Sequence, residues 1–344
     1  MADTKPEVAA EPAKPRIDDA REPEAAAEAP AEQRLSPPVA AAFLALCFLW
    51  GSTYLFIKIG VDHWPPVLLA SLRNLIAWTA VVLVLLSVAV IWRRPRPVHG
   101  IRGWWPAAGF GLMQGTGFAL IFWGERYITS GQTAVLIAFN PIFTLPLARW
   151  WIKEPIKRHH YVAVLFGVAG VALVAGVHHG SGFEGSVTMR IVAQVAVLGA
   201  ALCYAVSLLF SRKYMHGDRY VNTAINLGAS GFYLLLLSVL IDRGGQGVDF
   251  GWTGMLSLLY LALPGSALAY YLLFYLIENL DPVQVSYVTL VNPVVAVVLG
   301  IVFLSEPFPW MIGLGTAAVV LGTYHVHRPL RLPKLVGRGV PEPN

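Results

Sequence analysis

Long apolar stretches separated by short polar ones follow one another along most of the chain. A helix needs roughly 20 mostly apolar residues to cross a bilayer, and in lipid the backbone must satisfy its own hydrogen bonds. The pattern therefore predicts an all-α integral membrane protein with ten transmembrane helices. The ten segments are residues 39–59, 66–92, 104–124, 128–150, 160–178, 190–211, 221–241, 252–276, 280–304 and 309–326.

The composition agrees with a membrane protein and argues against a soluble one. The 344 residues are 56% hydrophobic and 13% charged, whereas a soluble domain carries about 25% charged residues. Residues 1–35 differ, because nine of the chain's 20 acidic residues fall there among alanine and proline. Such a stretch buries too little apolar surface to offset its ordering entropy, so we predict a disordered tail. The two cysteines are too few for a disulfide framework or a zinc site.

Lysine and arginine are concentrated in alternate loops. The loops after the second, fourth and sixth segments, with the adjoining helix ends, and the C-terminal tail hold fifteen of these residues, whereas the other loops hold Arg126 and Arg243. Cytoplasmic loops carry the excess of positive charge. We therefore expect a multi-pass membrane protein with both termini in the cytoplasm. The loop IENLDPV at 277–283 has neither lysine nor arginine and departs from the pattern.

One spelling occurs twice, at an offset of 152 residues. Residues 139–155 read FNPIFTLPLARWWIKEP and residues 291–307 read VNPVVAVVLGIVFLSEP, so Asn-Pro and Glu-Pro recur at equal spacing. A weaker match at an offset of 154 aligns WGSTYLFIK at 50–58 with YAVSLLFSR at 204–212. The chain is therefore interpreted as an internal duplication.

Each half contains five segments, so the second half must enter the membrane from the opposite side. Inverted repeats of this kind are common in secondary transporters and place the substrate near the membrane midplane. The predicted parts are a disordered cytoplasmic tail at 1–35, a first five-helix repeat at 36–180, a second, inverted five-helix repeat at 181–327 and a basic cytoplasmic tail at 328–344.

These features together resemble the drug/metabolite transporter (DMT) superfamily, and within it the EamA-type ten-helix branch. The similarity rests on FLWGSTYLFIK in the first segment, PPVLLASLRNLIA at the start of the second, and the doubled N-P…E-P. It covers roughly residues 39–327. It implies a carrier of the cytoplasmic membrane without an ATPase, often an exporter of amino acids or other small metabolites.

The first two segments hold the strongest single candidates. Trp50, Tyr54 and Lys58 recur every four residues and share one helix face. This face either lines a path for an amphipathic solute or forms an interfacial aromatic belt with a snorkelling lysine. Arg73 lies inside the second segment, where a charge is costly and suggests a functional site. It either meets a substrate carboxylate or pairs with helix-end carbonyls as a structural clamp.

Polar and aromatic side chains of other segments supply further candidates, for which contact with substrate and hydrogen bonding between helices are the alternatives. Pro141 and Pro293 lack a backbone donor and are expected to kink their helices. No carboxylate lies in the middle of a segment, so we expect transport to be facilitative or an exchange. Glu125 and Glu278, at segment ends, are the candidates for proton coupling. With Trp50, Tyr54 and Arg73, the predicted substrate-binding set is Gln114, Phe118, Gln132, Asn140, Tyr204, Tyr271, Gln284, Tyr287 and Asn292.

The predicted function is secondary transport, as an exporter, of small neutral or zwitterionic metabolites such as amino acids. Neither a Walker A sequence nor HExxH is present, so neither direct use of ATP nor a membrane enzyme is expected. The expected partners are a small-molecule substrate and the lipid bilayer, with no cofactor, metal or nucleic acid; the oligomeric state stays open. The alternatives are a carrier of phosphorylated solutes or nucleotide-sugars, which needs paired cationic residues at the midplane, and a channel-like or non-transporting membrane protein.

Overall fold

The computed structural model describes most of the chain between the two tails. The described residues are 36–91, 104–151, 153, 161, 165–166, 168–170, 172–173, 186–215, 218–242, 247–279, 288–306 and 310–327. The predicted tails at 1–35 and 328–344, and most of the predicted fifth span, lie outside these residues. So do Gln284 and Tyr287.

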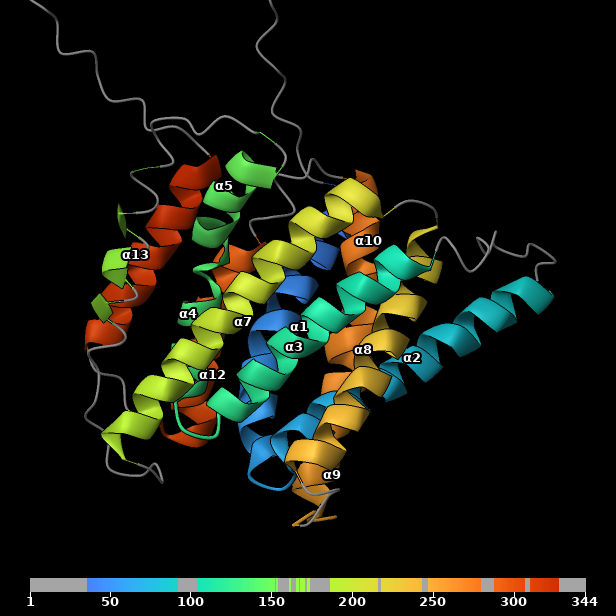
Figure 1. Ribbon diagram of the computed structural model, residues 1–344, viewed down its shortest axis with the longest axis horizontal. Helices are drawn as coiled ribbons and strands as arrows, with labels where there is room; N and C mark the ends of the chain where they lie inside the picture. Colours follow the sequence, from blue (N-terminus) through green and yellow to red (C-terminus); the bar gives the residue numbers. More distant parts are fainter. Residues whose placement is uncertain are drawn as a thin grey trace, which may run out of the picture. The chain divides into compact units, whose positions relative to one another are not determined.

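Every regular element in this part of the chain is a helix (Figure 1). The elements are α1 (Pro37–Val61), α2 (Pro66–Ile91), α3 (Trp105–Gly124), α4 (Ser130–Ile137), α5 (Asn140–Trp151), α7 (Val187–Tyr214), α8 (Arg219–Ile241), α9 (Trp252–Ala262), the π-helix η2 (Leu263–Leu268), α10 (Ala269–Asn279), α12 (Val288–Leu304) and α13 (Trp310–His327). The predicted all-α class is confirmed for these residues.

Six stretches of helix are long and apolar enough to cross a membrane, and Val291–Leu304 is a shorter apolar helix. The six are Pro37–Val61, Pro66–Ile91, Ser130–Trp151, Val187–Ser211, Tyr220–Ile241 and Trp252–Leu273. All of them coincide with predicted segments. The count of ten stays a prediction, because the fifth segment falls largely outside the described residues.

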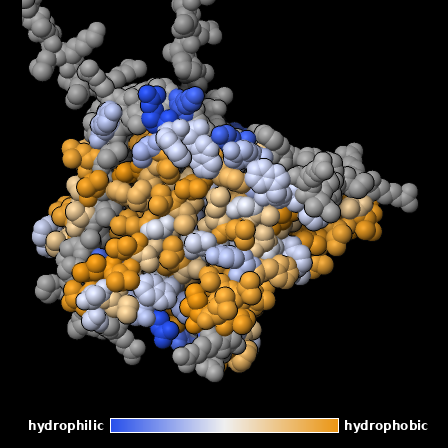
Figure 2. Space-filling model, viewed as in Figure 1, coloured by the Kyte–Doolittle hydropathy of each residue, from blue (hydrophilic) through white to orange (hydrophobic). Residues whose placement is uncertain are grey.

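The outward-facing side chains of these helices are apolar. Leucine, valine and phenylalanine side chains are exposed along α2, α8 and α12, among them Val90 at 76%, Leu240 at 72% and Phe303 at 67%. Figure 2 shows one face of the molecule, on which hydrophobic residues form a broad band and the most hydrophilic residues lie at its upper and lower ends. Apolar surface of this extent is suited to lipid.

Most of the helix packing is repeated when the two halves are exchanged. The sequence offsets pair α1 with α7, α2 with α8, α3 with α9–α10, and α4–α5 with α12. In the structure α2 packs against α8 and α4 against α12, each with its own counterpart. Three further contacts come in matched pairs: α1 with α9 and α10 as α7 with α3, α1 with α12 as α7 with α5, and α2 with α9 as α8 with α3. The contact of α2 with α3 has no counterpart of this kind between α8 and α9 or α10 in the described part of the chain. The duplication in the sequence is therefore also a duplication in three dimensions.

The repeated Glu-Pro turns share an uncommon backbone conformation. Lys153, with φ 58°, and Ser305, with φ 52°, are the two non-glycine residues with positive φ in the described part of the chain. Each directly precedes the glutamate of its Glu-Pro pair, at the 152-residue offset. Positive φ is uncommon for residues other than glycine, so its recurrence at this spacing shows that the two halves share the backbone conformation of the residue before each glutamate.

The repeated Asn-Pro pairs, in contrast, lie in different local structures. Helix α4 ends at Ile137 and α5 begins at Asn140, so the span is interrupted just before the first Asn-Pro. Helix α12 runs without interruption from Val288 to Leu304 with Pro293 inside it. The two halves therefore differ in conformation at equivalent positions. Helix α12 has no interruption at its Asn-Pro pair like the one between α4 and α5.

Small residues allow α3 to approach two helices closely. A Cβ atom on Gly111 would lie 2.6 Å from the backbone oxygen of Asn226 in α8, and one on Gly117 would lie 2.5 Å from Cε1 of Tyr204 in α7. Real Cβ atoms essentially never come this close to other atoms. The glycine face that the sequence shows in this segment is therefore a helix-packing surface.

Several helices begin or end together at one end of the bundle, here called the Glu125 end. The amide of Leu68 in the first turn of α2 donates to Oδ2 of Asp242 after α8 (2.8 Å), and Lys58 near the end of α1 contacts the turn after α3. Ser130, the first residue of α4, bonds to Glu306 after α12. The charge pattern of the loops predicts that this end faces outward.

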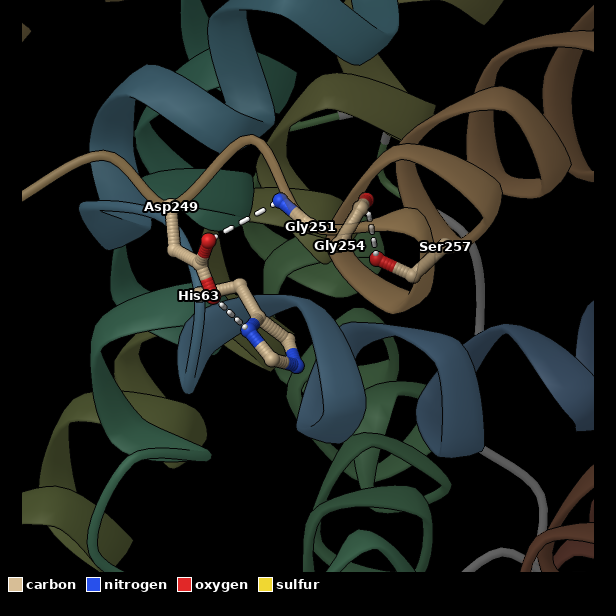
Figure 3. A network of polar contacts seen from close by, with 5 residues as sticks. All are labelled: His63, Asp249, Gly251, Gly254 and Ser257. Atoms are coloured by element: carbon tan, nitrogen blue, oxygen red, sulfur yellow. Dashed lines mark hydrogen bonds and ion pairs between the residues drawn. The ribbon is translucent and has the colours of Figure 1, made fainter.

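The turn after α1 and the loop before α9 are joined at this end by a small polar network (Figure 3). Oδ2 of Asp249 lies 2.9 Å from Nδ1 of His63, and Oδ1 accepts from the amide of Gly251 at 2.9 Å. The backbone amide of Asp249 donates to the carbonyl of His63 at 2.8 Å. The hydrogen bond with His63 and that from Gly251 lower the pKa of the Asp249 carboxyl below its ordinary value of 3.8.

The Asp249→Asn variant is expected to lower stability slightly at neutral pH. A carboxyl with a lowered folded-state pKa contributes stability above its ordinary value of 3.8 and loses it as the pH falls through the folded value. The gap between the melting temperatures of wild type and Asp249→Asn should therefore narrow only below pH 3.8. Thermal unfolding in detergent over a pH series measures it. A gap that stays constant through that range would show that the charge of Asp249 is irrelevant.

Candidate functional site

Arg73 is the charged residue at the centre of the bundle. Its side chain is 6% exposed, and its Nε donates to Oγ of Ser266 in η2 at 2.9 Å. The guanidinium carbon lies 4.8 Å from the centre of the Phe118 ring and 5.8 Å from that of Phe122. Within the described part of the chain, Ser266 is its one hydrogen-bond partner. The terminal nitrogens of Arg73 are thus left with donors that no described residue uses.

Three tyrosines from three helices face the guanidinium. Tyr54 comes from α1, Tyr204 from α7 and Tyr270 from α10, and all three lie within electrostatic range of Arg73. The Tyr270 hydroxyl also donates to Oε1 of Gln114 in α3 at 3.2 Å. Helices of both halves therefore supply polar groups to one place.

Two aromatic pairs flank this place and are related by the internal repeat. Trp50 and Tyr270 meet edge to face with ring centres 6.5 Å apart, and Tyr204 and Phe118 do so at 5.9 Å. Tyr204 follows Trp50 by 154 residues and Tyr270 follows Phe118 by 152, the offsets found in the sequence. One pair is thus the counterpart of the other, with Arg73 beside both. We call the residues around Arg73 the Arg73 cluster, which consists of Trp50, Tyr54, Arg73, Gln114, Phe118, Tyr204 and Tyr270.

Six of the predicted substrate-binding residues belong to this cluster, and Tyr270 was not among those predicted. The prediction chose Tyr271 instead, but the Tyr271 side chain is 56% exposed on the surface of α10. The π-helix η2 explains the difference, because its wider turn shifts the residues after it relative to an uninterrupted α-helix. The signal that would have found Tyr270 is its 152-residue offset from Phe118.

Other predicted residues are engaged in helix structure. Gln132 forms a capping box with Thr129 at the start of α4: the amide of Gln132 donates to Oγ1 of Thr129 at 3.1 Å, and the amide of Thr129 donates to Oε1 of Gln132 at 3.3 Å. Asn140 donates through Nδ2 to the carbonyl of Ala201 in α7 at 2.9 Å. Asn292 is half-buried, and its Oδ1 has no hydrogen-bond partner in the described part.

The structure says nothing of some predicted side chains. Gln284 and Tyr287 lie outside the described residues, and the side chains of Glu278 and Pro141 are not described although their backbones belong to α10 and α5. Within the described part, no group of three or more histidine, cysteine, aspartate or glutamate side chains is arranged to hold a metal ion.

A second polar group lies at the Glu125 end. Glu125 follows α3 directly and is 0% exposed, and neither of its carboxylate oxygens has a hydrogen-bond partner in the described part. Nζ of Lys58 donates to the backbone carbonyl of Glu125 at 2.5 Å. The carboxylate of Glu306 accepts from the amide and the hydroxyl of Ser130, both at 2.9 Å, and so caps α4 across the two halves.

Comparison with known proteins agrees with this architecture. The model of the EamA-like transporter family matches the chain twice, at residues 38–176 and 191–327. The chain belongs to the EamA-like transporter family. Each match covers one of the two halves, so the family's two-repeat membrane fold accounts for the paired packing. The resemblance to the DMT superfamily is confirmed.

Two relatives of this EamA-like protein extend the picture. It is 30% identical over 294 residues to the "Uncharacterized inner membrane transporter YedA" of Escherichia coli (strain K12), covering 83% of this chain and 90% of the relative. It is 26% identical over 298 residues to the "Probable amino-acid metabolite efflux pump" of Salmonella typhimurium, covering 82% and 93%. A solved structure with a TM-score of 0.56 and 17% identity, covering 84% of this chain and 96% of that one, supports the fold. The chain is a multi-pass inner-membrane transporter and not an enzyme.

Proposed function

We propose that this EamA-like protein exports small zwitterionic metabolites, such as amino acids, and that the Arg73 cluster binds them. The observation that carries the proposal is the Arg73 guanidinium, which is almost fully buried, keeps donors that no described residue uses, and lies beside two repeat-related aromatic pairs. The printed name of the Salmonella relative, an amino-acid metabolite efflux pump, supports the substrate class.

The chemistry of the cluster fits a carboxylate that carries an apolar part. A buried cation is costly unless an anion is nearby, and arginine binds a carboxylate through two parallel charge-assisted hydrogen bonds. The rings of Trp50, Phe118 and Tyr204 offer apolar surface to the rest of the solute. Binding sites for small molecules combine an apolar lining with a few polar groups in the same way.

Alternating access follows from the arrangement of the halves. With five spans in each half, the second repeat is inverted, and each half takes on the conformation of the other when the carrier switches sides. The difference between the interrupted α4–α5 and the continuous α12 supports this interpretation, because equivalent segments must differ in any state that opens to one side. The site would then lie near the midplane with both termini in the cytoplasm.

The alternative of a phosphorylated solute has less support. A phosphate group calls for two or more cationic side chains at one place. In the described part of the chain, Arg73 is the one cationic residue of the Arg73 cluster, and Lys58 bonds to backbone carbonyls at the Glu125 end. The channel alternative does not require paired cationic side chains. Transport kinetics distinguish a channel from a carrier.

The test is counterflow in proteoliposomes that contain the purified full-length protein. We expect an internal pool of an unlabelled neutral L-amino acid to drive transient accumulation of the same labelled compound. A labelled sugar phosphate serves as the comparison solute. Counterflow of the sugar phosphate, with none for any amino acid of the panel, would overturn the proposal. Flux that shows no counterflow and does not saturate would indicate a channel.

The aromatic side chains of the Arg73 cluster lead to a separate prediction. Trp50→Leu and Tyr204→Leu are each expected to reduce counterflow of an aromatic or large apolar amino acid about tenfold, because each ring contributes its buried area plus about 0.5–1.5 kcal/mol of aromatic contact. Glycine and alanine counterflow should fall much less. Tyr271→Leu is the matched control, since Tyr271 lies on the exposed side of α10. Equal losses for small and large amino acids would contradict a role in substrate selection.

A further inference from the structure

Glu125 is the one fully buried acidic side chain among the residues that the structure describes. It is 0% exposed, and both carboxylate oxygens lack a hydrogen-bond partner in that part of the chain. A buried carboxylate without hydrogen bonds is far less stable than the neutral acid. The surroundings of Glu125 therefore favour a carboxyl that carries a proton or binds a cationic group, and no described residue supplies that group.

The ammonium group of Lys58 lies at the same end of the bundle, but it bonds to backbone carbonyls. Nζ of Lys58 donates to the carbonyl oxygens of Glu125 and Arg126, at 2.5 and 3.5 Å, and so satisfies the carbonyl end of α3. The carboxyl of Glu125 receives no hydrogen bond from it. The Lys58 ammonium is thus already occupied by backbone groups.

The other groups around Glu125 are a few charged residues and the apolar side chains of α7. The charged groups in electrostatic range are Lys58 from α1, Arg73 from α2 and Glu306 after α12. Glu306 is bonded to Ser130. The α7 residues packed against Gly124, directly before Glu125, are the apolar Ala193 and Val197. Arg73, at the centre of the proposed substrate site, is thus one of the charged groups in electrostatic range of Glu125.

Glu125 is one of the two candidates for proton coupling in the sequence, and we propose how it acts: its carboxyl binds either a proton or the ammonium group of the substrate, and this exchange couples export to proton entry. The inference rests on the function proposed above, because it uses the carboxylate of the zwitterion on Arg73 as the first anchor. The two charges of an α-amino acid then match the Arg73 guanidinium and the Glu125 carboxylate. When the ammonium binds, the proton of the Glu125 acid leaves to water; when the substrate leaves, a proton returns.

This arrangement accounts for a carboxyl that has no hydrogen-bond partner among the described residues. Proton and ammonium are alternative ligands of one group, so each transport cycle exchanges one for the other. A site that holds either ligand, but not both, gives antiport, since the ligands compete thermodynamically. A proton entering the cell would thereby drive a zwitterion out.

The first test needs no substrate. Infrared spectra of the purified full-length protein in nanodiscs should contain the C=O band of a protonated carboxylic acid at neutral pH, and Glu125→Gln should remove it. Glu306→Gln is the matched control, because Glu306 holds Ser130 and should leave the band in place. Size-exclusion profiles confirm that both variants are folded, and Glu125→Asp keeps the acid if glutamine is not tolerated. Absence of a band that depends on Glu125 would overturn the proposal.

The second test measures coupling with labelled neutral L-amino acids in proteoliposomes. In wild-type proteoliposomes, a pH gradient with the acidic side inside should drive accumulation of the labelled amino acid in the vesicles. In the detergent-purified protein, a pH-indicator dye should report proton release when the amino acid is added. In Glu125→Gln the gradient should no longer drive accumulation and the proton release should be lost, and counterflow should fall because the ammonium loses its carboxylate partner. Glu125→Asp, which keeps an acid, should retain counterflow, the response to the gradient and the proton release. The matching 2-hydroxy acids, which lack the ammonium, should release no proton from the wild type.

The outcomes separate the two proposals. If no amino acid shows counterflow in the wild type, the proposed function fails, while the infrared test still reports on the proton of Glu125. If counterflow is present but the gradient has no effect, or if it still drives Glu125→Gln, the coupling role of Glu125 is wrong and the proposed function stands.

Discussion

Replacing Arg73 with methionine should reduce counterflow of neutral amino acids about 100-fold. Hydrogen bonds to charged groups contribute about 1.5–3 kcal/mol each, and 1.4 kcal/mol corresponds to a factor of ten. Arg73→Lys should recover only part of the loss, because an ammonium cannot form the two parallel bonds of a guanidinium. Ser266→Ala, which removes the partner of Nε but keeps the charge, should have a smaller effect.

The stability of Arg73→Met distinguishes substrate binding from a structural clamp. Burying a charge costs desolvation free energy, so replacing the buried guanidinium with an apolar side chain of similar volume should not lower the melting temperature in detergent. A clamp would lose stability and transport together. Amino acid amides, which lack the carboxylate, give a further comparison: wild type should prefer the acid over the amide, and Arg73→Met should lose the preference. A preference that persists in Arg73→Met would place the carboxylate elsewhere.

The Gly111→Ala substitution is expected to destabilise the protein by about 1–3 kcal/mol, the usual cost of overpacking. Its Cβ would lie 2.6 Å from the backbone oxygen of Asn226 and 3.2 Å from Cβ of Ala229, and backbone cannot move aside as a side-chain end can. Helices α3 and α8 would have to separate. Thermal unfolding in detergent measures the loss, and transport should fall with it because the Arg73 cluster includes Gln114 and Phe118 from α3.

Gly199→Ala is the matched control in α7. A Cβ atom there meets only Cδ1 of Leu120, at an ordinary 3.5 Å. Alanine is about 1 kcal/mol more favourable than glycine in a helix interior, so this variant should be as stable as the wild type or more so. Equal destabilisation by both substitutions would show that the geometry of the α3–α8 contact does not control stability.

Much of the architecture was predictable because it depends on patterns that are local in the sequence. Apolar length fixes where a helix can cross lipid, and the described helices lie at the predicted segments. The 152-residue offset predicted the duplication, which the paired helix contacts and the shared positive φ of Lys153 and Ser305 now show in three dimensions. Arg73 was singled out for the cost of a charge in lipid, and its surroundings bear out that it is buried.

Predictions of site residues that depended on which helix face a residue occupies were less reliable. An extra residue in the π turn η2 moved Tyr270 to the position expected of Tyr271. Gln132 has the spacing of a helix-face residue, yet its place at the start of α4 makes it a cap. Periodicity predicts which residues share a face, but a cap or a π turn depends on where the helix begins and how its neighbours hold it.

The sequence by itself determined the class, the helical segments and the two-fold repetition, because hydrophobic length and internal similarity need no knowledge of contacts. Only the tertiary structure decided which residues meet. It placed two aromatic pairs, related by the internal repeat, beside Arg73. It also left the Glu125 carboxyl without a hydrogen-bond partner among the described residues, while Lys58 donates to backbone carbonyls. Those relations join residues more than 60 positions apart, and they follow from the packing of whole helices against one another.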